Sequence, residues 1–144
     1  MRYMLLVYLD EQALSDSERE HCYVESARLA RDLNASGNYV SAGPLHPTAT
    51  ATSVRVRNGK RLVTDGPFAE TREQLGGYFL IDAEDLDEAI SIAAQIPGAR
   101  IGVVEIRPLM AIRRSSIIAV SAWIGTALRP RSLFTHQGQI QAAA

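Results

Sequence analysis

Residues 3–18 read YMLLVYLDEQALSDSE, and this stretch predicts a strand that leads through a short loop into a helix. Residues 3–9 are rich in leucine, valine and tyrosine, which is typical of a buried strand. Ser15 offers an N-cap, and Glu18 three residues later completes a capping box, so the helix is expected to begin there. Apolar residues at helical spacing then continue until Gly37, a residue type that commonly ends a helix.

The rest of the first 112 residues repeats this order of strand and helix. Asn58-Gly59 predicts the tight turn of a hairpin, because a type I′ turn needs positive φ at both positions. Asp82 is expected to cap the second helix, and Pro97-Gly98 to end it. The other expected elements are strands over residues 39–42, 50–57, 60–64, 75–82 and 101–107.

The order of these elements predicts the α+β class. Strand, helix, strand, hairpin, strand, helix and strand fit a ferredoxin-like β-α-β-β-α-β arrangement, with both helices on one face of an antiparallel sheet. The strands carry more apolar residues than two helices can cover. Among them are Leu5, Val7, Phe79, Ile81, Val103 and Val104. We therefore expect the open sheet face to be buried against a second copy of the chain, as a homodimer.

Length and composition indicate one globular domain. The 144 residues are 47% hydrophobic and 22% charged, with a net charge of −1, so we expect no direct binding of nucleic acid. A single cysteine, Cys22, excludes an internal disulfide framework and a cysteine-based zinc cluster. The apolar run at the N-terminus is too short for a membrane span, and Asp10 interrupts it before any signal-peptide cleavage site. A cytoplasmic protein with no membrane span is expected.

The charge is unevenly placed along the chain. Residues 1–112 hold all 16 acidic residues and 11 of the 15 basic ones, whereas residues 113–144 hold four arginines and no acid. This asymmetry predicts a domain over residues 1–112 and a basic extension over 113–144 that is weakly ordered or peripheral. Residues 116–128 are apolar at a spacing that a helix can use. Contact of this segment with a membrane surface or a partner stays an open alternative.

Three residues are candidates for catalysis. Asp10 ends the first strand and His21 lies in the first turns of the helix, and a His–carboxylate pair is an arrangement that general bases use. Asp65 follows the hairpin and precedes Gly66-Pro67, where it is either a general acid or base or a turn residue that accepts backbone N–H groups. The topology places all three near one sheet edge, so we expect one shared cleft. The alternative for His21 is a solvated helix residue.

His46 and Arg55 are candidates for substrate binding. His46 lies in a turn-rich loop, and Arg55 alternates with valines on the hairpin, where a guanidinium can bind a carboxylate or phosphate. The alternatives are a surface loop and an exposed strand face. Three scattered histidines without paired spacing do not indicate a metal site, and Gly76-Gly77 opens no helix that could hold a phosphate. No metal and no cofactor are expected.

Residues 65–78, DGPFAETREQLGGY, resemble the DGPF-motif branch of the YCII-related proteins. Residues 2–6, 48–55, 85–89 and 104–108 agree with this branch, so the resemblance covers roughly residues 1–112. It implies a ferredoxin-like fold in which two chains pack sheet to sheet as a dimeric α/β barrel. Residues 19–21 also resemble the Arg-Glu-x-His region of the wider group, shifted by one position at His21, and Asp10 sits where that group has its strand-1 aspartate.

The resemblance implies little about activity. A few relatives act on chlorinated aromatic compounds, and some members are encoded beside extracytoplasmic-function sigma factors. We expect a protein that binds or transforms a small polar or aromatic molecule in a cleft of the dimeric barrel, which leaves open whether it is an enzyme. Two alternatives are a non-catalytic regulatory partner linked to an extracytoplasmic-function sigma factor, and a structural dimer without a ligand.

Overall fold

The computed structural model describes residues 1–69 and 71–111, and residues Met1–Leu109 form one compact unit. Six strands and two α-helices make up the described chain, together with one-turn 3₁₀ helices at Thr48–Thr50 and Pro97–Arg100. In chain order the elements are β1 (Arg2–Leu9), α1 (Asp16–Ser36), β2 (Tyr39–Pro44), β3 (Thr52–Arg57), β4 (Lys60–Asp65), β5 (Gln74–Asp82), α2 (Leu86–Ala93) and β6 (Val103–Pro108). The predicted extension 113–144 lies outside the described residues.

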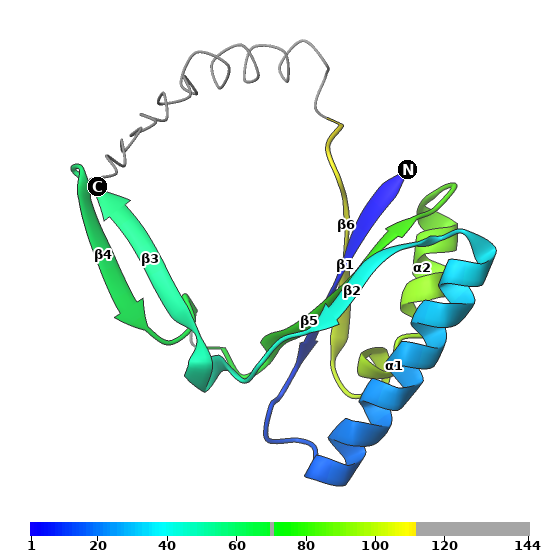
Figure 1. Ribbon diagram of the computed structural model, residues 1–144, viewed down its shortest axis with the longest axis horizontal. Helices are drawn as coiled ribbons and strands as arrows, with labels where there is room; N and C mark the ends of the chain where they lie inside the picture. The colour runs from blue at the N-terminus through cyan, green and yellow to red at the C-terminus, as the bar shows by residue number, and fades with distance from the viewer. Residues whose placement is uncertain (70, 112–144) are drawn as a thin grey trace, which may run out of the picture. The chain divides into compact units, whose positions relative to one another are not determined.

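The main sheet has four strands in the order β2-β5-β1-β6, and every neighbouring pair is antiparallel. α1 and α2 lie on the same face of this sheet (Figure 1). This order and connectivity make the fold ferredoxin-like, which confirms the predicted α+β class. β3 and β4 pair only with each other, in a separate two-stranded sheet inserted between the halves of the fold.

Local capping chemistry sets the bounds of α1. The Glu18 N–H donates to Ser15 Oγ at 3.4 Å, and the Ser15 N–H donates to Glu18 Oε2 at 2.8 Å, so the predicted capping box is present. The Ser15 hydroxyl donates to Glu18 Oε2 at 2.6 Å, and this bond, together with that from the Ser15 N–H, holds the pKa of Glu18 below its ordinary value, since both favour the carboxylate. Gly37 ends the helix with φ of 84°, a left-handed conformation that glycine adopts without strain.

The cap predicted for the second helix was wrong by three residues. Asp85, not Asp82, is the N-cap of α2, and its Oδ1 accepts the N–H of Glu88 at 2.9 Å. Asp82 is still part of β5, where its carboxylate lies 3.3 Å from the Arg2 guanidinium. Two further residues must follow β5 before the chain turns into the helix, so the later aspartate takes the capping position.

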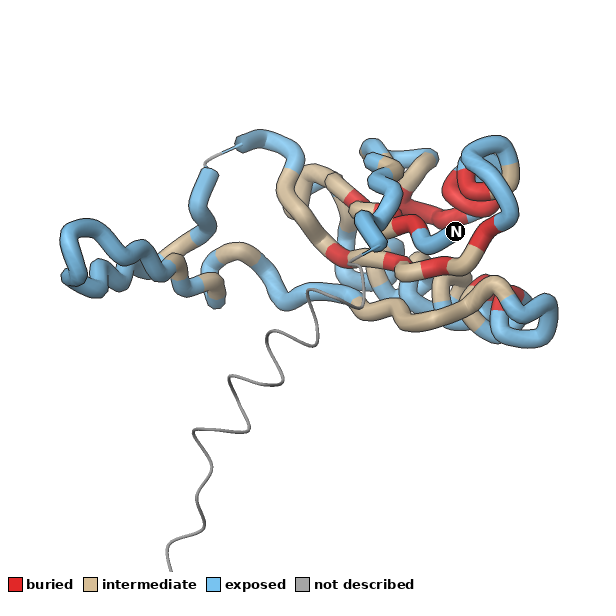
Figure 2. Tube along the Cα trace, turned by 90° about the horizontal axis from the view of Figure 1, so that it is seen from above, coloured by how far each residue is buried: buried red, intermediate tan, exposed pale blue. Residues whose placement is uncertain are grey.

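The core lies between the sheet and the helices. Buried red segments gather on this part of the chain, whereas the β3–β4 hairpin is exposed along nearly all its length (Figure 2). The core residues from β1 and β5 are Tyr3, Leu5, Val7, Phe79 and Ile81, and Val104 and Ile106 of β6 pack against them.

The strand register corrects our assignment of the open sheet face. Five of the six residues named for it (Leu5, Val7, Phe79, Ile81 and Val104) belong to the helix-covered core or pack against it, and only Val103 lies opposite. Alternation along the strands leaves Met4, Leu6, Tyr8, Tyr78 and Leu80 on the open face. The sequence is apolar on both faces of β1 and β5, so composition alone did not show which set faces the helices.

The hairpin turn is the one predicted. Asn58 and Gly59 have φ of 50° and 72°, and Arg57 pairs with Lys60 across the turn. Both residues adopt the positive φ that a type I′ turn requires, which asparagine and glycine tolerate best.

Candidate functional site

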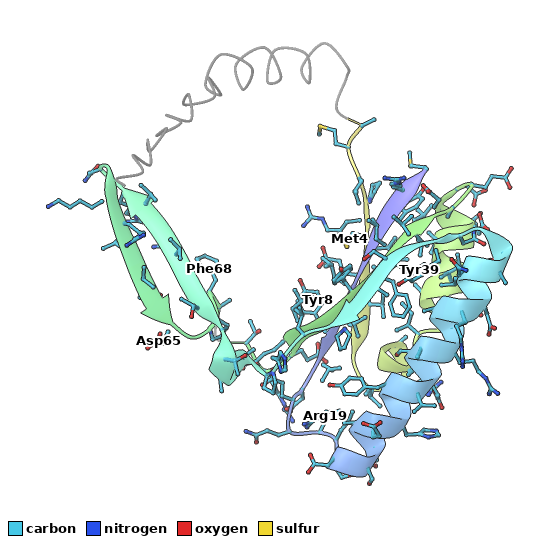
Figure 3. The ribbon with its side chains drawn as sticks, in the orientation of Figure 1. Met4, Tyr8, Arg19, Tyr39, Asp65 and Phe68 are labelled. Atoms are coloured by element: carbon cyan, nitrogen blue, oxygen red, sulfur yellow. The ribbon has the colours of Figure 1, made fainter. Side chains whose placement is uncertain are left out.

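A cavity of about 640 Å³ lies between α1 and the sheet. Its walls are mostly apolar and come from β1, α1, β2 and β5, with contributions from the loop after β1 and the 3₁₀ turn after α2. Figure 3 shows Tyr39 between β2 and α1, on the cavity side of the sheet, whereas Met4 and Tyr8 lie on the other side. A cavity of this size and character is typical of small-molecule sites.

Small residues keep the space between helix and sheet open. The α1 wall carries Ala27 and Ala30, and the facing strands carry Ala42, Gly76 and Gly77. A Cβ on Gly77 would lie 3.0 Å from the Gly43 carbonyl oxygen, closer than most Cβ atoms approach a neighbour, so glycine suits the close pairing of β2 with β5. Larger side chains at these positions would fill the cavity.

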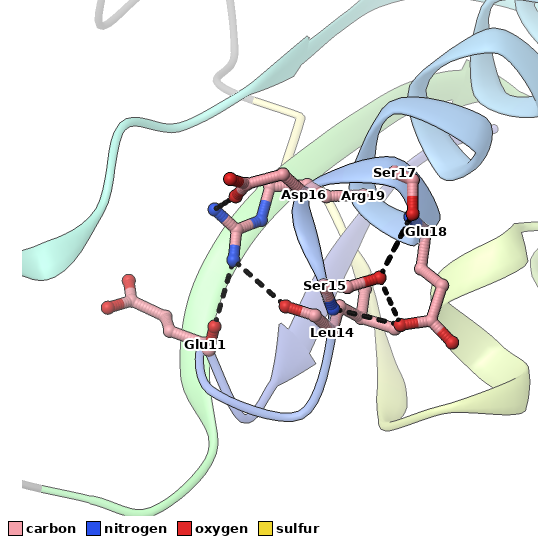
Figure 4. A network of polar contacts seen from close by, with 7 residues as sticks. All are labelled: Glu11, Leu14, Ser15, Asp16, Ser17, Glu18 and Arg19. Carbon is pink, nitrogen blue, oxygen red and sulfur yellow. Dashed lines mark hydrogen bonds and ion pairs between the residues drawn. The ribbon is translucent and has the colours of Figure 1, made fainter.

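Arg19 lies at the polar end of the cavity. Its Nη2 donates to the carbonyl oxygens of Glu11 and Leu14 at 3.1 and 3.4 Å, and its Nη1 lies 3.7 Å from the Asp16 carboxylate (Figure 4). The side chain is only 35% exposed. These contacts fix the guanidinium against the loop after β1, and its five N–H donors leave it able to bind an anionic group.

Glu11 links two loops beside the cavity. Its carboxylate accepts the backbone N–H of Thr48 at 2.8 Å and the Thr48 hydroxyl at 2.9 Å. Thr48 Oγ1 is also 2.7 Å from Gln74 Oε1, at the start of β5. The loop after β1, the segment after β2 and the first residue of β5 are therefore held together at one point.

Cys22 adds a polarisable atom to the lining, whereas the Tyr78 ring lies on the open face of the sheet, as its pairing with Leu6 requires. The Tyr78 hydroxyl lies 3.1 Å from Ser41 Oγ, which holds the ring in place on β5. Cys22 has a free thiol on α1 and is half-buried at the cavity wall.

The structure does not bring the three predicted catalytic residues into this cavity. Asp10 lines a second, shallower groove, where its carboxylate lies 3.4 Å from Arg72 Nε and accepts the Gln12 N–H at 2.9 Å. His21 is exposed on α1, and its Nε2 lies 3.0 Å from Glu25. Asp65 ends β4 on the exposed hairpin and pairs with Thr52 in the strand register (Figure 3).

The partner of His21 is held by a second cation. Arg100 makes an ion pair with Glu25, and this hydrogen bond is the main reason that the pKa of Glu25 lies below its ordinary value. Glu25 therefore joins α1 to the turn after α2, and His21 lies at the exposed edge of that ion pair.

The predicted binding residues lie elsewhere. The Arg55 guanidinium stacks over the Phe68 ring at 5.6 Å, on the hairpin and the turn after it. His46 is exposed in the loop after β2, between Leu45 and Pro47, and both neighbours line the cavity although His46 does not.

Two kinds of feature are absent from the residues that the structure describes. No group of three or more His, Cys, Asp or Glu side chains gathers there as a metal site would require. None of the helices in residues 1–69 and 71–111 is both long enough and apolar enough to span a membrane.

Residues 1–113 match the YCII-related domain. The chain belongs to the YCII-related family. This YCII-related chain is 42% identical over 118 residues to an uncharacterized protein of Rhizobium meliloti (strain 1021), and the match covers 76% of the chain and 92% of that relative. Among solved structures it is similar to 5-chloro-2-hydroxyhydroquinone dehydrochlorinase (TftG) from Burkholderia phenoliruptrix in complex with 2,5-dihydroxybenzoquinone. That similarity has a TM-score of 0.48 and 14% identity, over 78% of this chain and 96% of the other.

Sequence reasoning missed most residues of the cavity. It searched for titratable side chains, whereas the cavity of this YCII-related chain is built by alanines and glycines that leave space. The available signal was the placement of small residues on three facing elements: Ala27 and Ala30, Ala42-Gly43 and Gly76-Gly77. Such a signal is visible only once the pairing of β2 with β5 is known.

Proposed function

We propose that this protein binds a small, planar, largely apolar molecule with one anionic or hydrogen-bond-accepting group in the cavity between α1 and the sheet. The cavity itself is the observation that supports this function: about 640 Å³ of mostly apolar walls with a few polar groups at fixed positions. A flat ring fits between a helix and a sheet because both walls are extended surfaces. Arg19 supplies the cation for the acidic group.

Chemical transformation of the bound molecule stays a prediction. The catalytic roles of Asp10, His21 and Asp65 and the binding roles of Arg55 and His46 are predictions of the same kind, as is membership of the DGPF branch. The regulatory alternative, a partner linked to an extracytoplasmic-function sigma factor, also stays a prediction. A cytoplasmic location and the absence of nucleic-acid binding complete this set.

We also propose that the protein is a homodimer through the open sheet face. Met4, Leu6, Tyr8, Tyr78 and Leu80 support this proposal, since they lie on the face opposite the helices and remain only half-buried in the single chain. Burying this apolar surface against a second copy would remove it from water.

The cavity proposal is tested with a filling variant and a matched control. Ala30→Phe places a ring in the cavity, and Ala35→Phe makes the same change at an exposed position of α1 outside it. Benzoate, phenol and hexanoate are titrated into each protein by calorimetry at millimolar concentrations. We expect the wild type and Ala35→Phe to bind benzoate more tightly than phenol or hexanoate. The Kd of Ala30→Phe for benzoate should be at least tenfold higher than that of the wild type. Equal benzoate binding by all three proteins would contradict the assignment.

A further inference from the structure

The β3–β4 hairpin presents apolar side chains to solvent on both faces. Val54, Val56, Leu62 and Val63 are 50–67% exposed, and Phe68 just after the hairpin is 83% exposed. A two-stranded ribbon alone is marginally stable in water, because it has no sheet or helix to cover its apolar face. Among the described residues, no helix and no strand of the main sheet packs extensively against the β3–β4 hairpin. The hairpin therefore has apolar surface that a partner would cover.

The hairpin is also strongly basic. Residues 52–65 contain four basic side chains and one acidic one. The register sets Arg57 directly opposite Lys60, so two cations face each other across the ribbon. Like charges in this position repel and destabilise the strand pair. An anionic surface against this end of the hairpin would remove the repulsion, so the partner should be acidic as well as apolar.

The open sheet face carries a groove that is both acidic and apolar. It is about 800 Å³ in volume, and its walls combine Tyr8 and Val103 with the carboxylates of Asp10, Glu73 and Glu105. Two of these carboxylates have cations nearby: Arg72 lies 3.4 Å from Asp10, and Arg107 lies 3.7 Å from Glu105. No hairpin residue lines the groove of its own chain.

The charge of the rest of the chain favours the same kind of partner. Outside the hairpin, residues 1–112 contain 15 acidic and seven basic residues. The chain thus carries a basic apolar ribbon and, separately, an acidic apolar groove that this ribbon does not fill. Two surfaces of this kind on one chain are complementary in a two-fold dimer, because each copy can supply the ribbon for the other.

We propose that the hairpin of one copy packs into the groove on the open sheet face of a second copy, with Arg57 and Lys60 near Glu73 and Glu105. The groove is then completed by the partner, and the two-fold axis repeats the contact. This inference rests on the proposed dimer and adds which segment holds it together. The proposed contact also accounts for the isolation of β3 and β4 from the main sheet, since the hairpin would pack against the sheet of the second copy and not against its own.

Charge reversal of the full chain tests this contact. Arg57→Glu/Lys60→Glu reverses the hairpin, and Glu73→Lys/Glu105→Lys reverses the groove. Arg28→Glu/Arg31→Glu is the matched control for the hairpin reversal, because it makes the same charge change on exposed positions of α1. Self-association is measured by sedimentation velocity over a range of concentrations, and circular dichroism checks that each variant is folded. We expect each reversal to raise the dimer Kd by about tenfold or more, and the control to change it little.

The two reversed proteins are then mixed. Reversed hairpins now meet reversed grooves, so we expect the mixture to associate more tightly than either variant alone. If the wild type dimerises and neither reversal changes its Kd, the hairpin contact is wrong and the sheet-face dimer stands. If the wild type stays monomeric at every concentration, the dimer itself is wrong and the contact falls with it. If hairpin reversal abolishes retention on heparin but leaves the dimer unchanged, the hairpin serves a polyanion and our proposal is overturned.

Discussion

Leu5 and Leu6 are neighbours in β1 whose side chains lie on opposite faces of the sheet, and replacing each with alanine tests this assignment. Leu5 is fully buried, and it pairs across the sheet with Phe79 on β5 and Ile106 on β6. Leu6 is only half-buried and pairs with Tyr78 and Glu105. The two substitutions remove the same atoms from adjacent positions, so any difference reflects the surroundings.

The cost of Leu5→Ala follows from its burial. Removing three buried carbons at about 0.8 kcal/mol each gives about 2.4 kcal/mol of lost transfer free energy. The cavity left among rigid neighbours adds to this, for a total of about 3–4 kcal/mol. The melting temperature should fall by on the order of 15 °C. Because the lost contacts are within one chain, this loss should not depend on protein concentration.

Leu6→Ala should behave differently. At a concentration where the chain is monomeric, we expect the free energy of unfolding to fall by about 1 kcal/mol or less. At higher concentration the wild type gains stability by association, and this gain should be smaller in Leu6→Ala. Urea unfolding at two protein concentrations measures both effects. A loss in dilute Leu6→Ala as large as that in Leu5→Ala would refute the assignment of faces.

Two other substitutions test close contacts. Gly102→Ala would place a Cβ against the Tyr8 carbonyl oxygen and 3.0 Å from Leu9 Cα, and since backbone cannot yield cheaply we expect a loss of about 1–3 kcal/mol by urea unfolding. The control is Gly43→Ala, whose Cβ meets only the Tyr78 ring at an ordinary 3.5 Å; an equal loss there would contradict the argument. Glu25→Gln tests the Arg100 ion pair. The folded-state pKa of Glu25 is lowered, so its stabilisation is present above about pH 4.5 and is lost as the pH falls through the folded pKa. We expect the free energy of unfolding of Glu25→Gln to depend less on pH between 5 and 3 than that of the wild type, with Glu20→Gln as control, and an unchanged pH dependence would refute the role of the pair.

Features that depend on a few adjacent residues were predictable from the sequence. The capping box at Ser15 and Glu18, the stop at Gly37 and the turn at Asn58-Gly59 are confirmed, because each needs a residue type at a fixed local offset. The element order then led to the ferredoxin-like fold, since few topologies accommodate it.

Features that depend on long-range pairing were not predictable in the same way. The sequence does not show which side chains of β1 and β5 face the helices, because both strands are apolar on both sides. The strand register shows it, since Leu5 pairs with Phe79 and Ile106. The cavity depends on β2 lying beside β5, which brings Ala42 and Gly77 under α1. For the candidate site, the sequence drew attention to charged residues, while the space is formed by residues without side-chain chemistry.

The central position of β1 has a consequence for the order of folding. Both strands that pair with it come from the last third of the described chain, so its partners are about 65–105 residues away in sequence. During synthesis α1 can form from local contacts, but β1 must remain unpaired until β5 has left the ribosome. An apolar strand that waits this long is exposed to aggregation. Chaperone demand should therefore depend on the time needed to synthesise the residues between α1 and β5, the inserted hairpin included.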